Sequence, residues 1–364
     1  MPRLWDVPVH DSTRVRDARV AAEGAAALAG LDERRTAAAA LVATELATNL
    51  LKHAGGGQVL VDVVAPPVAR AGSGHSSLVQ ITAIDHGPGM ADVCAAQRDG
   101  FSTARSLGAG LGTCRRVADD FALHSAAGRG TVALARIGPA APRPDGPDPA
   151  PQDHPDGPEL PAPVRAGGVN VPFAEAAYSG DAWAWVRSGD RLTLMLADGL
   201  GHGPEAARAS SAAVRTLQCA AHLRPAGLLA RLDEALRATR GAAVALAQLD
   251  LRTGLLRFAG IGNIGARLRE GDGWRALLSR PGIVGLHRPA TLTEHEAPWT
   301  ADRLLILHSD GLPSRWTPPS GPVLPTADPA VTAAVILRDT SSPAHPVRDD
   351  TTVAVLTPTP PDRP

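Results

Sequence analysis

PAAPRPDGPDPAPQDHPDGPELPAP, residues 139–163, decides how the chain is organised, because it holds ten prolines among 25 residues. Proline removes backbone donors and favours extended polyproline conformations. Almost no side chain in this stretch is able to bury itself in a core. We therefore predict a semi-rigid linker over residues 139–164, with a reach of up to about 75 Å at roughly 3.1 Å per residue. One domain is predicted before it, at 1–138, and one after it, at 165–358.

Composition limits the class of protein. The length of 364 residues suits about two domains, and the net charge of −1 gives no electrostatic reason for a nucleic-acid or anionic-membrane partner. Cys94, Cys114 and Cys219 are scattered and lack C-x-x-C spacing, which argues against a disulfide framework or a zinc site. No stretch approaches the roughly 20 apolar residues of a membrane span. We expect a cytoplasmic protein.

The first predicted domain contains a helix, from Asp32 to about Ala54, with a polar face beside its apolar one. Glu45, Asn49 and Lys52 line this face at spacings of four and three. They offer a base, a metal-binding amide oxygen and a phosphate-binding cation. The alternative is an ordinary solvated face, which this helix taken alone favours.

Two glycine motifs after this helix weaken that alternative. Two predicted strands, 58–64 and 78–84, lead into DHGPGM at residues 85–90, which suits a tight turn with its backbone close to a ligand. SLGAGLG at residues 106–112 then leads into a predicted helix, TCRRVADDFAL, at residues 113–123. Glycines that open a helix present backbone amides to phosphate groups. The three elements in this order indicate a nucleotide site.

ELATN, DHGPGM and LGAGLG resemble the N, G1 and G2 boxes of the GHKL ATPase/kinase superfamily. The run at residues 99–131 resembles its switch serine kinases and anti-sigma factors, of the RsbT/RsbW type. The resemblance implies a Bergerat α/β sandwich that binds ATP and Mg²⁺, with Glu45 as the base that activates a protein serine and residues 100–107 as a mobile lid. Lys52 meets a phosphate or is a surface lysine. The residues placed on the nucleotide or its Mg²⁺ are Asn49, Lys52, Asp85, Gly87, Gly89, Gly108, Gly110 and Gly112.

The second predicted domain alternates apolar strands with helices, which indicates a layered α/β arrangement. The predicted strands are 183–186, 192–196, 242–249, 255–259, 303–307 and 351–356, and the predicted helices are 204–223, 226–237 and about 330–337. Aspartates mark the ends of these strands, at Asp181, Asp198, Asp310 and the pair Asp349 and Asp350. Converging carboxylates suit magnesium or manganese. Any one of these sites alone is equally consistent with a turn.

SGD, ADGLGHG, SDG and DDTTV resemble the metal-dependent PPM protein phosphatases of the SpoIIE/RsbX-like branch, and GIGN at 260–263 resembles that family's glycine-rich turn. The resemblance implies a PPM-type αββα sandwich with two Mn²⁺ or Mg²⁺ ions. Asp198 then bridges both ions with help from the Gly199 carbonyl, Asp310 holds one ion, and Asp181 is an outer or direct ligand. Asp349 is assigned as a ligand of the same ion as Asp310, with its neighbour Asp350 as the alternative.

His202 is a candidate general acid for the departing serine oxygen. Many members of the family place a histidine directly after Asp-Gly, whereas this chain has Leu200 there and reaches histidine two residues later. A structural role at a helix start is the alternative.

A kinase-like and a phosphatase-like domain in one chain suggest opposing chemistry on one phosphoserine. The resemblance supplies a STAS-domain antagonist protein as the candidate partner, with a sigma factor or a second phosphatase as further possibilities. The leading hypothesis is a bifunctional partner-switching regulator that phosphorylates and dephosphorylates this partner. The alternative is a first domain that binds ATP without transferring phosphate and controls the phosphatase.

Overall fold

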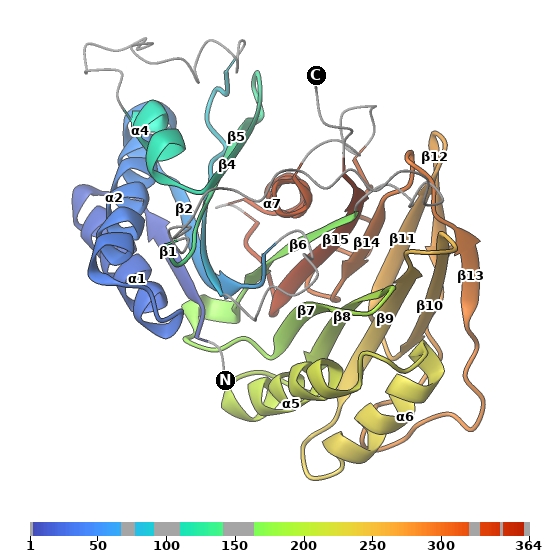
Figure 1. Cartoon of the computed structure of the whole chain (residues 1–364). Helices are drawn as coiled ribbons and strands as arrows, with labels where there is room; N and C mark the ends of the chain where they lie inside the picture. Colours follow the sequence, from blue (N-terminus) through green and yellow to red (C-terminus); the bar gives the residue numbers. More distant parts are fainter. Residues whose placement is uncertain are drawn as a thin grey trace, which may run out of the picture.

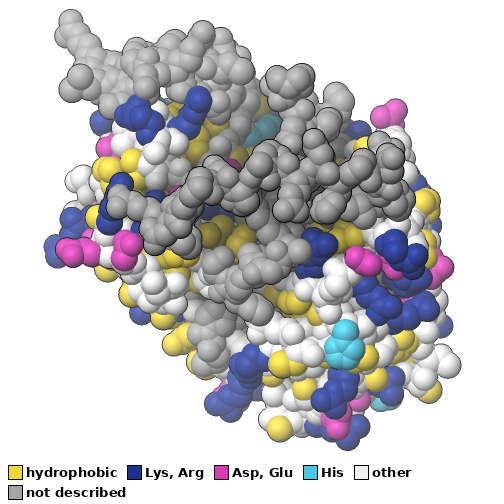
Figure 2. Space-filling model, in the orientation of Figure 1, with side chains coloured by type: hydrophobic (Ala, Val, Ile, Leu, Met, Phe, Trp, Pro, Cys, Tyr) yellow, Lys and Arg dark blue, Asp and Glu magenta, His cyan; other side chains and the backbone are white. Residues whose placement is uncertain are grey.

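The structure is a computed structural model that describes residues 3–66, 77–90, 110–140, 164–319, 328–342 and 345–359 (Figure 1). No helix within these ranges is long and apolar enough to cross a membrane. On the face in Figure 2, basic and acidic side chains are interspersed, as the net charge of −1 leads one to expect.

The N-terminal part forms one five-stranded sheet in the order β1-β2-β3-β5-β4, and every neighbouring pair is antiparallel. Its strands are β1 (Trp5–Val9), β2 (Gly57–Val64), β3 (Leu78–Ile84), β4 (Asp120–Ala126) and β5 (Gly130–Ile137). The helices α1 (Ser12–Leu28), α2 (Glu33–Asn49) and α4 (Gly110–Val117) lie on one face of this sheet (Figure 1). The Asp11 and Asp32 carboxylates cap α1 and α2 by accepting backbone N–H groups of the first turn.

One prediction for this part holds with a change of helix type, and one is wrong. The second helix does end at Ala54, but Leu50–Ala54 forms a π-helical turn that Gly55 closes at φ 72°. Lys52 lies within this turn and is exposed, whereas Glu45 and Asn49 are half-buried. The helix predicted over 113–123 ends at Val117, and the following residues form β4. Pairing with β5 satisfies the backbone of β4 and overrides the helical pattern.

The C-terminal part contains two stacked antiparallel sheets, in the orders β13-β10-β9-β8-β7 and β12-β11-β14-β15-β6. The first sheet consists of β7 (Asp181–Ser188), β8 (Arg191–Gly199), β9 (Ala242–Asp250), β10 (Leu255–Ile261) and β13 (His295–Pro298). The second consists of β6 (Val164–Val171), β11 (Gly265–Glu270), β12 (Gly273–Leu277), β14 (Leu305–His308) and β15 (Thr351–Pro358). Apolar side chains of both sheets share one buried core, which includes Leu194 and Leu307.

Helices cover both outer faces of this pair of sheets, which gives an αββα sandwich. The helices α5 (Pro204–Ala220) and α6 (Pro225–Leu236) lie on the first sheet, and α7 (Pro329–Thr340) lies on the second (Figure 1). A short 3₁₀ turn, Phe173–Glu175, follows β6. The six strands and three helices predicted here are all present, with shifted ends.

The two parts of the chain share a buried apolar cluster around α7. Leu60 and Leu134 of the N-terminal sheet belong to the same cluster as Val169 and Val355 of the C-terminal part, with the apolar side chains of α7 between them. The sequence predicted two bodies joined by a linker and did not predict this shared core. Residues 141–163 of that linker lie outside the described ranges.

Candidate functional site

In the N-terminal part, the polar side chains of α2 meet the glycine that opens α4. A Cβ added to Gly110 would lie 3.1 Å from Glu45 Oε2 and 3.1 Å from Asn49 Oδ1. Glu45 and Asn49 are half-buried, and Asn49 Nδ2 is a buried donor with no hydrogen-bond partner in the described part of the chain. The Glu45 carboxylate, the Asn49 amide and the first residue of α4 therefore lie beside one another, and a side chain at position 110 would crowd the two polar groups.

Asp85 lies directly after β3 at the start of the predicted turn. Its Oδ1 accepts the backbone N–H groups of Gly87, at 2.8 Å, and of Thr131, at 3.1 Å. Burial raises the pKa of Asp85, and these two hydrogen bonds oppose the shift. Gly89 has a φ of 66°, and a Cβ on Gly87 would lie 2.7 Å from Ala54 Cβ, so the turn requires both glycines.

The remaining nucleotide-site candidates are placed less fully. The Lys52 side chain is exposed and forms no ion pair with a described residue. Gly112 is buried within α4. Gly108 and the predicted lid at residues 100–107 lie outside the described ranges.

In the C-terminal part, Asp181 and Asp198 face each other across the paired strands β7 and β8. Asp181 is buried, and neither of its carboxylate oxygens has a hydrogen-bond partner among the described residues. Burial and then the charge of Asp198 raise its pKa well above the usual range. Burial also raises the pKa of Asp198 to about 7, with further contributions from Asp310, Asp349 and Asp350. The five aspartates thus share one electrostatic environment.

The three later aspartates differ in what holds them. Asp310 is exposed, and its Oδ2 accepts the amide N–H of Asn263 at 2.7 Å. Asp349 is exposed, and its Oδ1 accepts the backbone N–H of Asp350 at 2.8 Å.

The Asp350 carboxylate is buried, and backbone groups occupy both of its oxygens. They accept the N–H groups of Phe173, at 2.8 Å, and Gly180, at 2.7 Å. Of the two neighbours, Asp349 therefore has the freer carboxylate. Asp350 fixes the loops that lead into β7.

Two further candidates lie where β8 meets α5. Gly199 packs under α5, because a Cβ there would lie 2.2 Å from the Ala206 carbonyl oxygen. The His202 side chain is exposed, and its ring centroid lies 6.4 Å from that of Phe173. No described residue fixes its orientation by a hydrogen bond.

The cluster consists of carboxylates, which are the ligands that a hard divalent cation prefers. Two of them, Asp310 and Asp349, are exposed and act electrostatically on Asp198. Within the described ranges, no three or more acidic, histidine or cysteine side chains are arranged to hold a metal ion as they stand. The raised pKa values of Asp181 and Asp198 nevertheless mark a concentration of negative charge that a cation would relieve.

Two asparagines orient this cluster, and the sequence motifs gave neither a role: Asn263 ends the GIGN turn, and Asn170 lies outside every motif. Asn263 bonds to Asp310, and the buried Asn170 donates its amide N–H to the Asp181 carbonyl oxygen at 2.9 Å. The GIGN motif could have indicated Asn263, because this asparagine directly follows the glycines at the end of a strand. Nothing in the sequence of β6 indicates a role for Asn170.

Two family models match the chain. Residues 9–137 match the histidine kinase-like ATPase domain, and residues 188–358 match Stage II sporulation protein E, SpoIIE. The chain joins a histidine kinase-like ATPase domain to a SpoIIE phosphatase domain. In the ATPase domain, Glu45, Asn49 and Gly110 meet, and in the phosphatase domain the aspartates cluster.

Individual relatives cover different shares of the chain. The serine/threonine-protein kinase RsbT of Bacillus subtilis (strain 168) is 43% identical over 88 residues, which are 24% of this chain and 61% of that kinase. The chain thus spans less than two thirds of the kinase's length. A solved structure from work on the bacterial stressosome is 29% identical, with a TM-score of 0.47, and the match covers 53% of this chain and 98% of that one. The solved phosphatase domain of SpoIIE from Bacillus subtilis, with a fragment of its regulatory domain, is 15% identical with a TM-score of 0.47. This match covers 96% of this chain and 98% of that one.

Proposed function

We propose that the protein is a partner-switching regulator that phosphorylates a serine of a STAS-domain protein with its ATPase domain and removes that phosphate with its phosphatase domain. One observation carries the proposal: the chain contains two distinct polar sites. In the first, Glu45 and Asn49 of α2 lie beside the start of α4, and in the second, several carboxylates act on Asp198. We assign residues 1–138 to the ATPase domain, 139–164 to a linker and 165–358 to the phosphatase domain.

In the kinase reaction, Glu45 takes the proton of the partner's serine hydroxyl while the serine oxygen bonds to the γ-phosphorus of ATP and the bond to ADP breaks. Asn49 would hold Mg²⁺, with its amide oxygen as the available ligand. One carboxylate oxygen of Asp85 accepts backbone N–H groups of Gly87 in its own turn and of Thr131 in β5, which orients the other oxygen for the adenine amine. The glycines of the two motifs admit the nucleotide close to the backbone.

In the phosphatase reaction, the divalent ions would be held by Asp198, the Gly199 carbonyl, Asp310 and Asp349, with Asp181 as an outer or direct ligand. When bound, two Mn²⁺ or Mg²⁺ ions supply an activated water and neutralise the phosphoryl oxygens. His202 is exposed at the edge of the site and gives a proton to the leaving serine oxygen, or it serves only the start of α5. Asp350 keeps the loops in place and is not a ligand.

The test uses γ-labelled ATP, STAS-domain candidates and four variants of the full chain. Asp198→Asn removes the central carboxylate, so labelled partner is expected to accumulate instead of being erased. Adding Glu45→Gln to it is expected to abolish the label while nucleotide affinity stays within about twofold. Glu33→Gln, on the exposed start of the same helix, and Asp272→Asn, in an exposed turn, are the matched controls.

Label that persists without Glu45 would overturn its role as base. ATP binding without any labelled partner would leave the ATPase domain as a binding module, in which case a sigma factor or a second phosphatase becomes the partner to test. Failure of the wild type to hydrolyse any phosphoserine protein with Mn²⁺ would overturn the phosphatase assignment.

A further inference from the structure

The helix α7 belongs to the phosphatase domain but is enclosed by both domains. It is buried from Pro329 to Arg338, with β6 and β15 on one side and the ATPase sheet on the other (Figure 1). A helix that is apolar all round has no solvent face. Any shift of α7 must therefore be accommodated by both domains.

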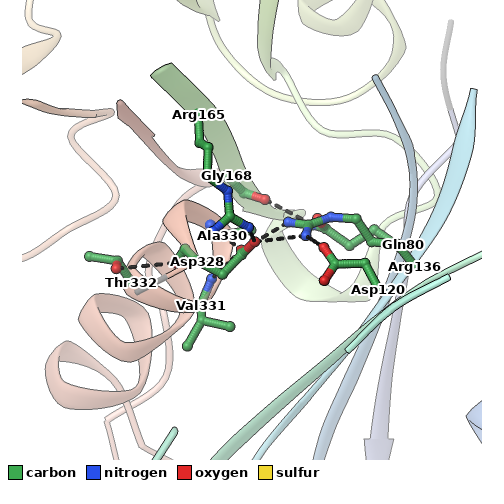
Figure 3. A network of polar contacts seen from close by, with 9 residues as sticks. All are labelled: Gln80, Asp120, Arg136, Arg165, Gly168, Asp328, Ala330, Val331 and Thr332. Carbon is green, nitrogen blue, oxygen red and sulfur yellow. Dashed lines mark hydrogen bonds and ion pairs between the residues drawn. The ribbon is translucent and has the colours of Figure 1, made fainter. Parts of the chain in front are cut away.

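The start of α7 is fixed to the ATPase sheet by a buried ion-pair network (Figure 3). The Asp328 carboxylate caps the helix and accepts two hydrogen bonds from the Arg136 guanidinium, at 2.8 and 2.9 Å. Arg165 adds a third, at 2.6 Å, and Asp120 accepts a hydrogen bond from the same Nη1 of Arg136 that donates to Asp328. Burial alone would raise the pKa of Asp328, but the two arginines lower it. This end is a fixed point of the interface.

The end of α7 is attached instead to the nucleotide motif. His86, which follows Asp85 in the chain, places Nε2 at 2.9 Å from the Arg338 carbonyl oxygen and 2.8 Å from the Ser341 carbonyl oxygen. With the proton on Nε2, the ring donates to both carbonyls at the C-terminus of the helix. A change in the turn that carries Asp85 is thus passed directly to this end.

The chain that leaves α7 leads to the carboxylate cluster. Asp349 lies nine residues after Thr340, and β15 begins at Thr351. A cavity of about 680 Å³ borders the His86 contact and is lined by His86 and Ser341 and also by Phe173, whose N–H binds Asp350. The start of α7 is therefore held by the Asp328 network, and its end lies beside this cavity.

We propose that nucleotide binding regulates the phosphatase through His86 and α7, so that occupancy of the ATPase domain and metal-dependent hydrolysis are coupled. The inference rests on the proposed nucleotide and phosphatase sites. Coupling between two binding sites is reciprocal, and typical couplings change affinity about 5- to 150-fold. Nucleotide should change the apparent Mn²⁺ affinity by at least about fivefold, and Mn²⁺ should change the nucleotide affinity by the same factor.

The experiment measures both effects on the full chain, with a non-hydrolysable ATP analogue that excludes phosphoryl transfer. Mn²⁺ titrations are followed by p-nitrophenyl phosphate hydrolysis with and without the analogue. Analogue affinity is measured by calorimetry with and without Mn²⁺ in wild type and in Asp198→Asn, and the Mn²⁺ effect that Asp198→Asn retains is assigned to the ion that Asn49 would hold with the nucleotide and is subtracted. His86→Ala is expected to bind both ligands and to lose the coupling, and His86→Gln, which keeps an N–H donor, to restore part of it. His53→Ala, an exposed histidine of the same domain, is the matched control and should behave as wild type.

The outcomes separate this inference from the proposed function. A wild type that binds no analogue or hydrolyses no phosphate contradicts the proposed sites themselves. A wild type that does both, with each affinity unchanged by the other ligand, overturns the coupling alone. Coupling that survives intact in His86→Ala overturns the route through His86.

Discussion

The two helical layers of the phosphatase domain hold the same place in the αββα sandwich but have different surroundings. On α5, Glu205 and Arg208 pair at the surface with side chains that are 49% and 61% exposed. On α7, Asp328 and Arg136 pair with side chains that are 2% and 1% exposed, because the ATPase sheet covers that layer. The α5 layer therefore faces solvent, whereas the α7 layer is part of a core that both domains share.

Asp328→Ala should produce the largest difference between the layers. It leaves Arg136 buried without its main counter-charge and removes the cap of α7. Breaking a buried pair on one side costs about 3–5 kcal/mol, and the lost cap adds about 1 kcal/mol. Urea unfolding measures the loss. Glu205→Ala is the control, with an expected change below about 1 kcal/mol. Equal losses would mean that the interior pair is not formed in solution.

Two large-to-small substitutions compare buried apolar positions on α7 and on α6. Ile336→Ala on α7 and Leu232→Ala on α6 both empty buried positions, and each should cost about 2–5 kcal/mol. Only the first should also loosen the ATPase domain, because α7 packs in the cluster shared with β2 and β5. Hydrogen exchange resolved by domain distinguishes the two. Unchanged exchange in the ATPase strands of Ile336→Ala would remove the argument for a shared core.

A pH-dependent effect is expected at Asp6, which lines the cavity beside α7. Burial raises the pKa of Asp6 from 3.8 to about 6, against the hydrogen bond from Gln58. The folded state therefore binds the proton more tightly than the unfolded state, and stability is lost as the pH rises from about 4 to about 6. Asp6→Asn should be more stable than wild type by about 3 kcal/mol at pH 7.5 and similar at pH 4, by urea unfolding. The exposed Asp17→Asn should show no such difference between the two pH values.

The smallest effect is expected where the interface reaches solvent. Arg129, 63% exposed, pairs with Asp339 at the end of α7. Arg129→Ala should cost less than about 1 kcal/mol, and the loss should shrink further in high salt. Thermal unfolding at two salt concentrations measures both. A loss as large as that of Asp328→Ala would mean that this rim, and not the buried network, holds the domains together.

Sequence alone predicted the parts of the sites that lie in local motifs. Glu45 and Asn49 share a helical face, and Asp181, Asp198 and Asp310 lie at strand ends, so spacing was sufficient to find them. The role of Asp350 was not predictable, because its partner Gly180 is 170 residues away.

The interface was also beyond the sequence, since Arg136 and Asp328 are separated by 192 residues and either charge alone is consistent with an exposed position. The run PAVTAAVILR, at residues 329–338, did carry a signal. A helix with so few polar residues needs a partner on each side. The sequence predicts this helix but not the element that covers its second face. Strand β4 was misassigned because pairing with β5 outweighs a local helical pattern.

The π-helical turn at the end of α2 has a practical consequence. It carries Lys52, the only lysine among 364 residues, in an exposed position next to the turn of Asp85, where Ala54 meets Gly87. A protease specific for lysine has a single peptide bond to cut in the whole chain, and the cut divides it into fragments of 52 and 312 residues. The rate of that one cleavage, followed on a gel with and without ATP, reports the opening of a single turn in an otherwise uncut protein.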